Sequence, residues 1–69
     1  MADAPTLQEF NAGESGRSFV VFDQTVQEYW KDDGFTKSAS EAQVFNGGFE
    51  TQEQLDAAWK HGCRIDYVQ

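Results

Sequence analysis

The chain has 69 residues, with 12 Asp and Glu against 5 Lys and Arg, which gives a net charge of −7. A chain of this length forms one domain, and its charge repels nucleic acids and anionic membranes while attracting basic surfaces. No run of about 18 apolar residues occurs, so the sequence predicts no membrane-spanning helix.

Residues 1–16 contain the only proline and two of the six glycines. This composition predicts a flexible N-terminal tail in front of a single domain over residues 17–69. Within the tail, Thr6 and Glu9 have the spacing of a capping box. A helical turn there would place Leu7 and Phe10 on one face, from which both could contact the domain.

Residues 18–22, Ser-Phe-Val-Val-Phe, form a short apolar run rich in β-branched and aromatic side chains. This pattern predicts a strand. Because residues on both of its faces are apolar, we expect it in the centre of a sheet, or with one face covered by the tail.

Two segments permit more than one interpretation. Over residues 25–34, the capping-box pair Thr25 and Glu28 favours a short helix, and a hairpin with a strand from Val26 to Trp30 is the alternative. Residues 39–46 are compatible with either a helix or a strand.

The pattern from Thr51 to His61 predicts the principal helix. Thr51 and Gln54 form a second capping box, and Gly62 follows the last turn as a stop signal. Asp56 and Lys60 have the spacing of an ion pair on its exposed side.

Residues 63–68 alternate between apolar and polar side chains, which predicts a half-exposed strand beside residues 19–22. The fold class expected from these elements is α+β, with a small antiparallel sheet packed against one C-terminal helix.

Motifs for chemistry are weak in this chain. Cys63 is the only cysteine and His61 the only histidine, too few for a zinc site, and they follow a helix end, where a thiolate is disfavoured. Gly47-Gly48 is not followed by the lysine of a phosphate-binding loop. We therefore expect no catalytic residue, no metal and no cofactor, and hence a protein that is not an enzyme.

A single cysteine excludes an internal disulfide, and small domains without disulfides are typical of a reducing compartment. The first ten residues also lack the basic start and apolar stretch of a secretory signal. These features predict a cytoplasmic protein.

The acidic residues are the main candidates for function. No Lys or Arg occurs between Lys37 and Lys60, although four acids do, and a second cluster precedes this gap. Spaced carboxylates on a small body can imitate a phosphate backbone, and aromatic residues are frequent in binding hot spots. The predicted protein-binding residues are Glu41, Glu50, Glu53, Asp56, Asp32, Asp33, Tyr29 and Trp30.

In its size, acidity, single cysteine and expected α+β class, the chain resembles the small proteins with which phages disable host nucleic-acid machinery. These include anti-CRISPR proteins, RNA polymerase inhibitors and DNA mimics. The resemblance is one of type, without a shared motif, and it implies a phage protein in the host cytoplasm.

The function expected from the charge and from this resemblance is inhibition without catalysis. The acidic face would occlude a basic surface of a nucleic-acid-handling protein, without direct binding to nucleic acid or membrane. The alternative is a small accessory or structural subunit that docks through an exposed aromatic residue, Trp30, Phe35 or Phe49. A monomer and a homodimer are both compatible with the sequence.

Overall fold

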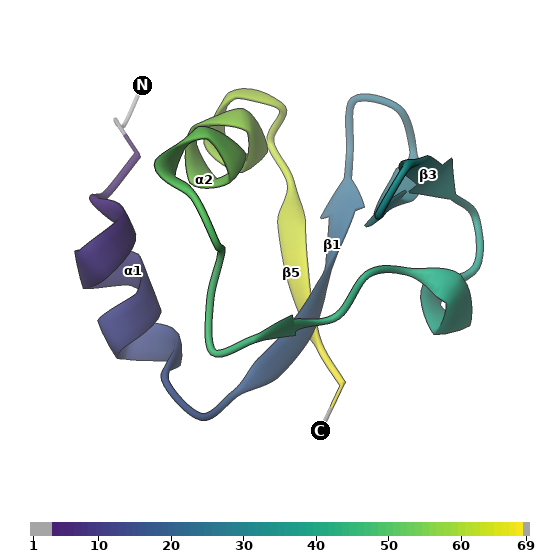
Figure 1. The fold of residues 1–69 in the computed structure, drawn as a ribbon. Coiled ribbons are helices and arrows are strands. Elements are labelled where there is room, and N and C mark those ends of the chain that lie inside the picture. The colour runs from purple at the N-terminus through teal and green to yellow at the C-terminus, as the bar shows by residue number, and fades with distance from the viewer. Residues whose placement is uncertain (1–3, 69) are drawn as a thin grey trace.

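The computed structural model describes residues 4–68 and shows an antiparallel sheet of five strands with two α-helices (Figure 1). The expected α+β class is confirmed. In chain order the elements are α1 (Leu7–Glu14), β1 (Ser18–Asp23), β2 (Glu28–Lys31), β3 (Gly34–Thr36), the 3₁₀ helix η1 (Ala39–Glu41), β4 (Phe45–Asn46), α2 (Gln52–Lys60) and β5 (Arg64–Tyr67). Within residues 4–68, neither α-helix is long and apolar enough to cross a membrane.

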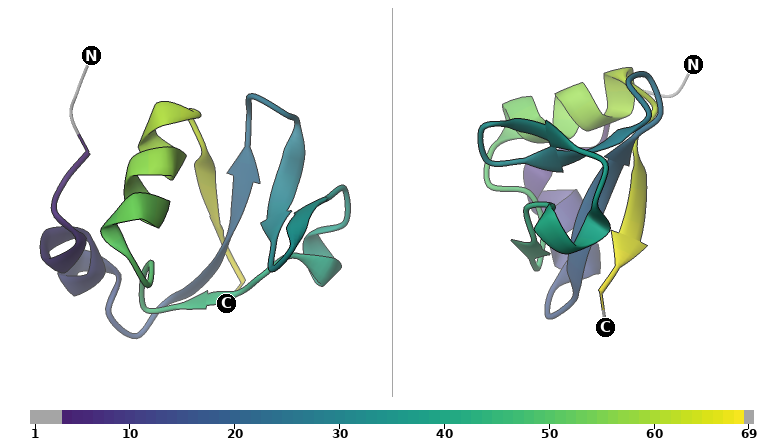
Figure 2. Two further views of the ribbon diagram at one scale, coloured as in Figure 1. Left: turned by 45° about the horizontal axis from the view of Figure 1, so that its top comes forward. Right: turned by 90° about the vertical axis from the view of Figure 1, so that its right-hand side faces the viewer.

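Strand β1 is the centre of the sheet, as its apolar run predicts. Phe22 pairs with Tyr29 of β2 and with Arg64 of β5, and Phe19 pairs with Phe45 of β4 and with Tyr67 of β5. Strand β5 therefore occupies one edge of β1, while β2 and β4 share the other edge at its two ends (Figure 2).

Residues 25–34 do not form the helix that the capping-box spacing favoured. The Asp23 carboxylate accepts a hydrogen bond from the Thr25 backbone N–H, and Gln27 adopts a positive φ of 61°, so the chain turns back on itself. The Thr25 hydroxyl donates to the carbonyl of His61 instead of capping a helix. Strands β2 and β3 then form a hairpin, as the alternative interpretation expected. Its first strand begins at Glu28, two residues after the expected start at Val26.

Residues 39–46 contain both kinds of element. The single turn of η1 is followed by the two-residue strand β4. Between them, the Gln43 backbone N–H donates to the carbonyl of Trp30 at 3.0 Å. This bond ties the loop to the β2–β3 hairpin.

The range in which the sequence predicts a flexible tail, residues 1–16, contains helix α1; residues 1–3 of it and Gln69 lie outside the described range. The capping box of Thr6 and Glu9 is formed. The Asn11 side chain donates to the carbonyl of Phe49 at 2.8 Å and accepts from its N–H at 3.0 Å. These contacts join segments 38 residues apart, which is why composition alone did not indicate them.

Helix α2 is confirmed with the predicted capping box of Thr51 and Gln54. The expected pair of Asp56 with Lys60 is absent from the ion pairs among residues 4–68. Asp56 accepts a hydrogen bond from the Gln52 side chain instead.

The core lies between the sheet and the two helices. Rings from five elements or loops meet there at centroid distances of 5.0 to 6.4 Å. Buried apolar side chains and the partly buried ones packed on them are Phe19, Val21, Phe45, Phe49, Leu55, Ala58, Leu7, Phe10, Trp30, Cys63 and Ile65. Aromatic rings, which bury a large area per residue, thus form much of the core of this short chain.

Candidate functional site

Asp23 is the only charged side chain among residues 4–68 that is fully buried. Its Oδ1 accepts the Thr25 N–H at 2.9 Å, and its Oδ2 accepts the Trp30 indole N–H at 3.1 Å. Nδ1 of His61 lies 2.9 Å from the same Oδ2. A buried carboxylate is stable only with such partners, so Asp23 fixes the β1–β2 turn, the end of α2 and the Trp30 ring relative to one another.

The ionisation of this cluster follows from its contacts. Burial raises the pKa of Asp23, but the hydrogen bonds from His61, Trp30 and Thr25 outweigh burial and hold that pKa below its ordinary value. Burial and the neighbouring Asp23 charge raise the pKa of the Cys63 thiol to about 12. The thiol is therefore neutral at physiological pH, which disfavours a nucleophilic role for Cys63.

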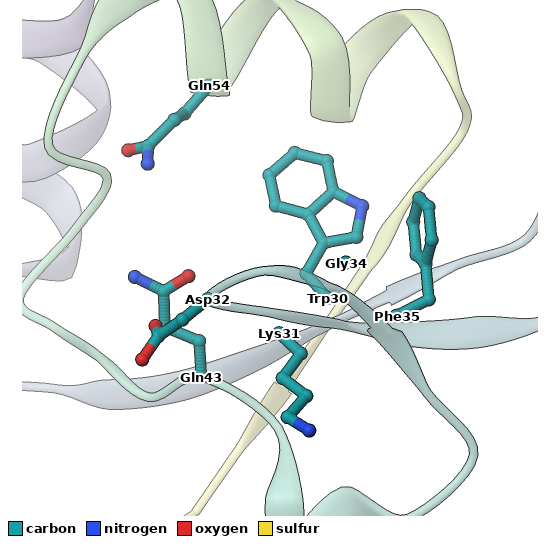
Figure 3. A pocket seen from close by; sticks show the side chains of 7 residues that line it. All are labelled: Trp30, Lys31, Asp32, Gly34, Phe35, Gln43 and Gln54. Atoms are coloured by element: carbon teal, nitrogen blue, oxygen red, sulfur yellow. The ribbon is translucent and has the colours of Figure 1, made fainter.

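A hollow of about 230 Å³ lies between the β2–β3 hairpin and α2. Trp30 forms part of its wall, Gln54 reaches it from α2, and Asp32 and Gln43 also line it (Figure 3). Its complete lining is Trp30, Lys31, Asp32, Gly34, Phe35, Gln43 and Gln54. The volume is below that of typical pockets for drug-sized ligands, about 300–1,000 Å³.

One of the predicted acids, Asp32, lines this hollow, and three others adjoin its lining residues. Asp32 and Asp33 form the β2–β3 turn, and both are exposed. On the other side, the Glu50 backbone N–H donates to the Gln54 side chain at 2.8 Å, and Glu53 precedes Gln54 in α2. We call these four residues, Asp32, Asp33, Glu50 and Glu53, the acidic edge.

Three other predicted residues lie outside the acidic edge. Glu41 belongs to η1, which is well separated from α2 in both figures of the fold. Asp56 lies one turn further along α2, bonded to Gln52. Tyr29 packs on Phe22, with ring centroids 5.0 Å apart. Because neighbouring strand residues point to opposite faces, Tyr29 and Trp30 lie on opposite sides of the sheet.

Of the aromatic side chains that the sequence nominated for binding, only Phe35, a candidate for the alternative function, is exposed. Tyr29 and Trp30 are half-buried, whereas Phe35 is 47% exposed and Trp59 is 42% exposed. Phe49, one of the candidate anchors for apolar docking, is 2% exposed and belongs to the core. Phe35 pairs across the hairpin with Trp30 and lines the hollow, so it is the aromatic residue of the site that a partner can reach.

Sequence reasoning did not include Gln43 and Gln54 among the binding residues, and it named Phe35 only as a candidate anchor of the alternative function. It did not single out Asp23 as an anchor. Gln54 was visible only as a capping residue. A weak signal for Asp23 exists, since an aspartate two residues before a threonine at a strand end is typical of a turn in which the carboxylate accepts a backbone N–H.

Comparisons with family models, with curated proteins and with solved structures found no match to this chain. Among residues 4–68, no three His, Cys, Asp or Glu side chains are placed to hold one metal ion.

Proposed function

We propose that this protein binds a basic surface of a nucleic-acid-handling protein through its acidic edge and inhibits that protein by occlusion. The observation that carries the proposal is the acidic edge itself. Asp32 lines a hollow with an aromatic wall. Asp33 and Glu53 are chain neighbours of lining residues, and the Glu50 backbone N–H is bonded to the lining residue Gln54. None of the four carboxylates forms an ion pair among residues 4–68. Their charge is therefore available to a partner.

Electrostatic attraction supports this mode of binding. A net charge of −7 on a body with a radius of gyration of 11.2 Å creates a strong negative potential around the molecule. Such a potential speeds association with a cationic groove, and the gain falls as salt rises. A protein seated in that groove would exclude nucleic acid by competition for the same Lys and Arg residues. Anti-CRISPR proteins and DNA mimics, which this chain resembles in type, act on such surfaces.

The first experiment identifies the partner by capture from lysate, with elution by rising NaCl. The partner is then purified, and its binding to DNA or RNA is measured with and without this protein. We expect a basic partner whose affinity for nucleic acid falls in proportion to the amount of this protein, and whose own affinity for this protein weakens with salt. An affinity independent of salt, or unchanged binding of nucleic acid, would contradict the proposal.

A second candidate function is that of an accessory subunit that docks through apolar contacts. The exposure of Phe35 at 47% favours it, because an exposed aromatic ring beside a hollow is a typical interface anchor. In that case Phe35→Ala would abolish binding while increasing salt would leave it unchanged.

A further inference from the structure

We infer that the hollow beside Trp30 is a receptor for one arginine side chain of the partner. This inference rests on the proposed function and specifies its chemistry. The acidic edge alone requires only that the partner be positively charged. The hollow adds that one charged group of the partner is planar and lies at the end of a protein side chain.

The size of the hollow selects a side chain over a larger ligand. About 230 Å³ is too little for a nucleotide or another cofactor of that size, and it opens directly to solvent between the hairpin and α2. A single long side chain that enters from outside fits such a space. Its backbone would remain at the rim, next to the acidic edge.

The lining selects a cation, and arginine over lysine. The Trp30 ring forms an aromatic wall, over which a guanidinium can stack. Asp32 contributes a carboxylate and Gln43 an amide oxygen to the lining, and both groups can accept the N–H groups of a guanidinium. Lys31 also lines the hollow, but its ammonium group points away from the Trp30 ring.

The aromatic wall is held in place before any ligand arrives. The Trp30 indole N–H is bonded to the buried Asp23, and its ring packs on Phe45 and Phe49. The Trp30 carbonyl accepts the Gln43 N–H, so two parts of the lining are tied to each other. A site fixed in this way loses little conformational entropy on binding. Holding the Trp30 ring in this way gives the buried Asp23 a structural role in the site.

The test is an NMR titration of the whole protein with N-acetyl-arginine N-methylamide. Matched probes are the corresponding citrulline and lysine derivatives, the first neutral with the same shape and the second charged without the planar group. We expect a saturable shift of the Trp30 indole signal and of the Gln43 and Gln54 side-chain amides, with a dissociation constant on the order of 10 mM for so small a ligand. Citrulline should give no saturation, and lysine should bind more weakly than arginine.

The substitutions Asp32→Asn and Asp33→Asn distinguish binding in the hollow from general electrostatic attraction to the acidic edge. They remove the same charge from adjacent positions of one exposed turn, but only Asp32 lines the hollow. Asp32→Asn should weaken arginine binding about fivefold or more, and Asp33→Asn should weaken it less than about twofold.

Any of four results would overturn the inference. These are equal effects of the two substitutions, binding of the citrulline derivative equal to that of arginine, binding of the lysine derivative as tight as that of arginine, and an unchanged Trp30 signal. The proposed function fails on different evidence. If the partner's affinity depends on salt while the arginine probe does not bind, the acidic edge is retained and the receptor is rejected.

Discussion

At the scale of single residues, Asp23 determines the geometry of the candidate site. Its carboxylate is hydrogen-bonded to the Thr25 N–H in the β1–β2 turn, to the Trp30 indole and to His61. These groups come from three parts of the chain. The sequence indicated Asp23 only as one acid of a cluster, because burial depends on which elements cover a residue. No local pattern distinguishes a buried aspartate from an exposed one.

Replacing Asp23 by asparagine tests this role. The amide keeps the size of the side chain but loses the charge and places an N–H₂ among donors, so Asp23→Asn should lower the free energy of unfolding by about 2–4 kcal/mol. The matched control is Asp66→Asn, which affects a partly exposed pair with Arg64 and should cost less than about 1 kcal/mol. Urea denaturation measures both. A similar loss in the two variants would mean that Asp23 has no special structural role.

The lowered pKa of Asp23 determines how the stability of the fold changes at acidic pH. A carboxyl whose folded pKa lies below its unfolded value stabilises the fold above the unfolded value, about 3.9, and loses that contribution as pH falls further. Wild-type protein should therefore lose stability below about pH 4 more steeply than Asp23→Asn. Parallel curves for the two proteins in urea denaturation from pH 2 to 7 would contradict this expectation.

From the raised pKa of Cys63 we predict a loss of stability at high pH. Its folded value of about 12 exceeds the ordinary value of 9.0, so its contribution to stability is present below pH 9 and is lost as pH rises above it. For the same reason, alkylation of the native thiol by iodoacetamide at pH 8 should be more than about 100-fold slower than alkylation of the urea-unfolded chain. Similar rates in the two states would show that the thiol is not protected.

At the scale of elements, the sequence correctly predicted the helices and strands that are determined by neighbouring residues in the chain. Helix α2 has its capping box, its apolar stripe and its glycine stop within the twelve residues from Thr51 to Gly62, and β1 is a dense apolar run. Residues 25–34 carried a capping-box pattern too, but Asp23 and His61 took the groups that would have capped a helix. The element was decided by contacts at a sequence distance of up to 36 residues.

Helix α1 depends on a close contact at Gly48. A Cβ added there would lie 1.9 Å from Oδ1 of Asn11, the side chain that binds the Phe49 backbone, and the φ of Gly48 is +138°. Gly48→Ala should therefore lower the free energy of unfolding by about 2 kcal/mol or more.

The control for this prediction is Gly13→Ala in α1. A Cβ at Gly13 meets nothing within 4 Å, so this substitution should raise stability by up to about 1 kcal/mol through helix propensity. If both substitutions leave the urea midpoint unchanged, α1 is not held to the domain by the Asn11 contact.

At the scale of the whole molecule, the sequence indicated the fold class and the sign of the surface charge, but not the distribution of that charge. Acids that are close in the chain became separated, since Glu41 is the last residue of η1 while Glu50 lies just before α2. Acids that are distant in the chain, Asp32 and Glu50, came to flank one hollow through the hairpin and Gln54. Only the pairing of strands decides such proximity.

The most direct measurement of the central claim compares Glu50→Lys with Glu41→Lys in their affinity for the captured partner. Both side chains are exposed, both substitutions change the net charge by two units, and only Glu50 belongs to the acidic edge. Our account predicts that Glu50→Lys weakens binding about fivefold or more at moderate salt, while Glu41→Lys has less than half that effect. Equal losses from the two substitutions, or no loss from Glu50→Lys, would contradict it.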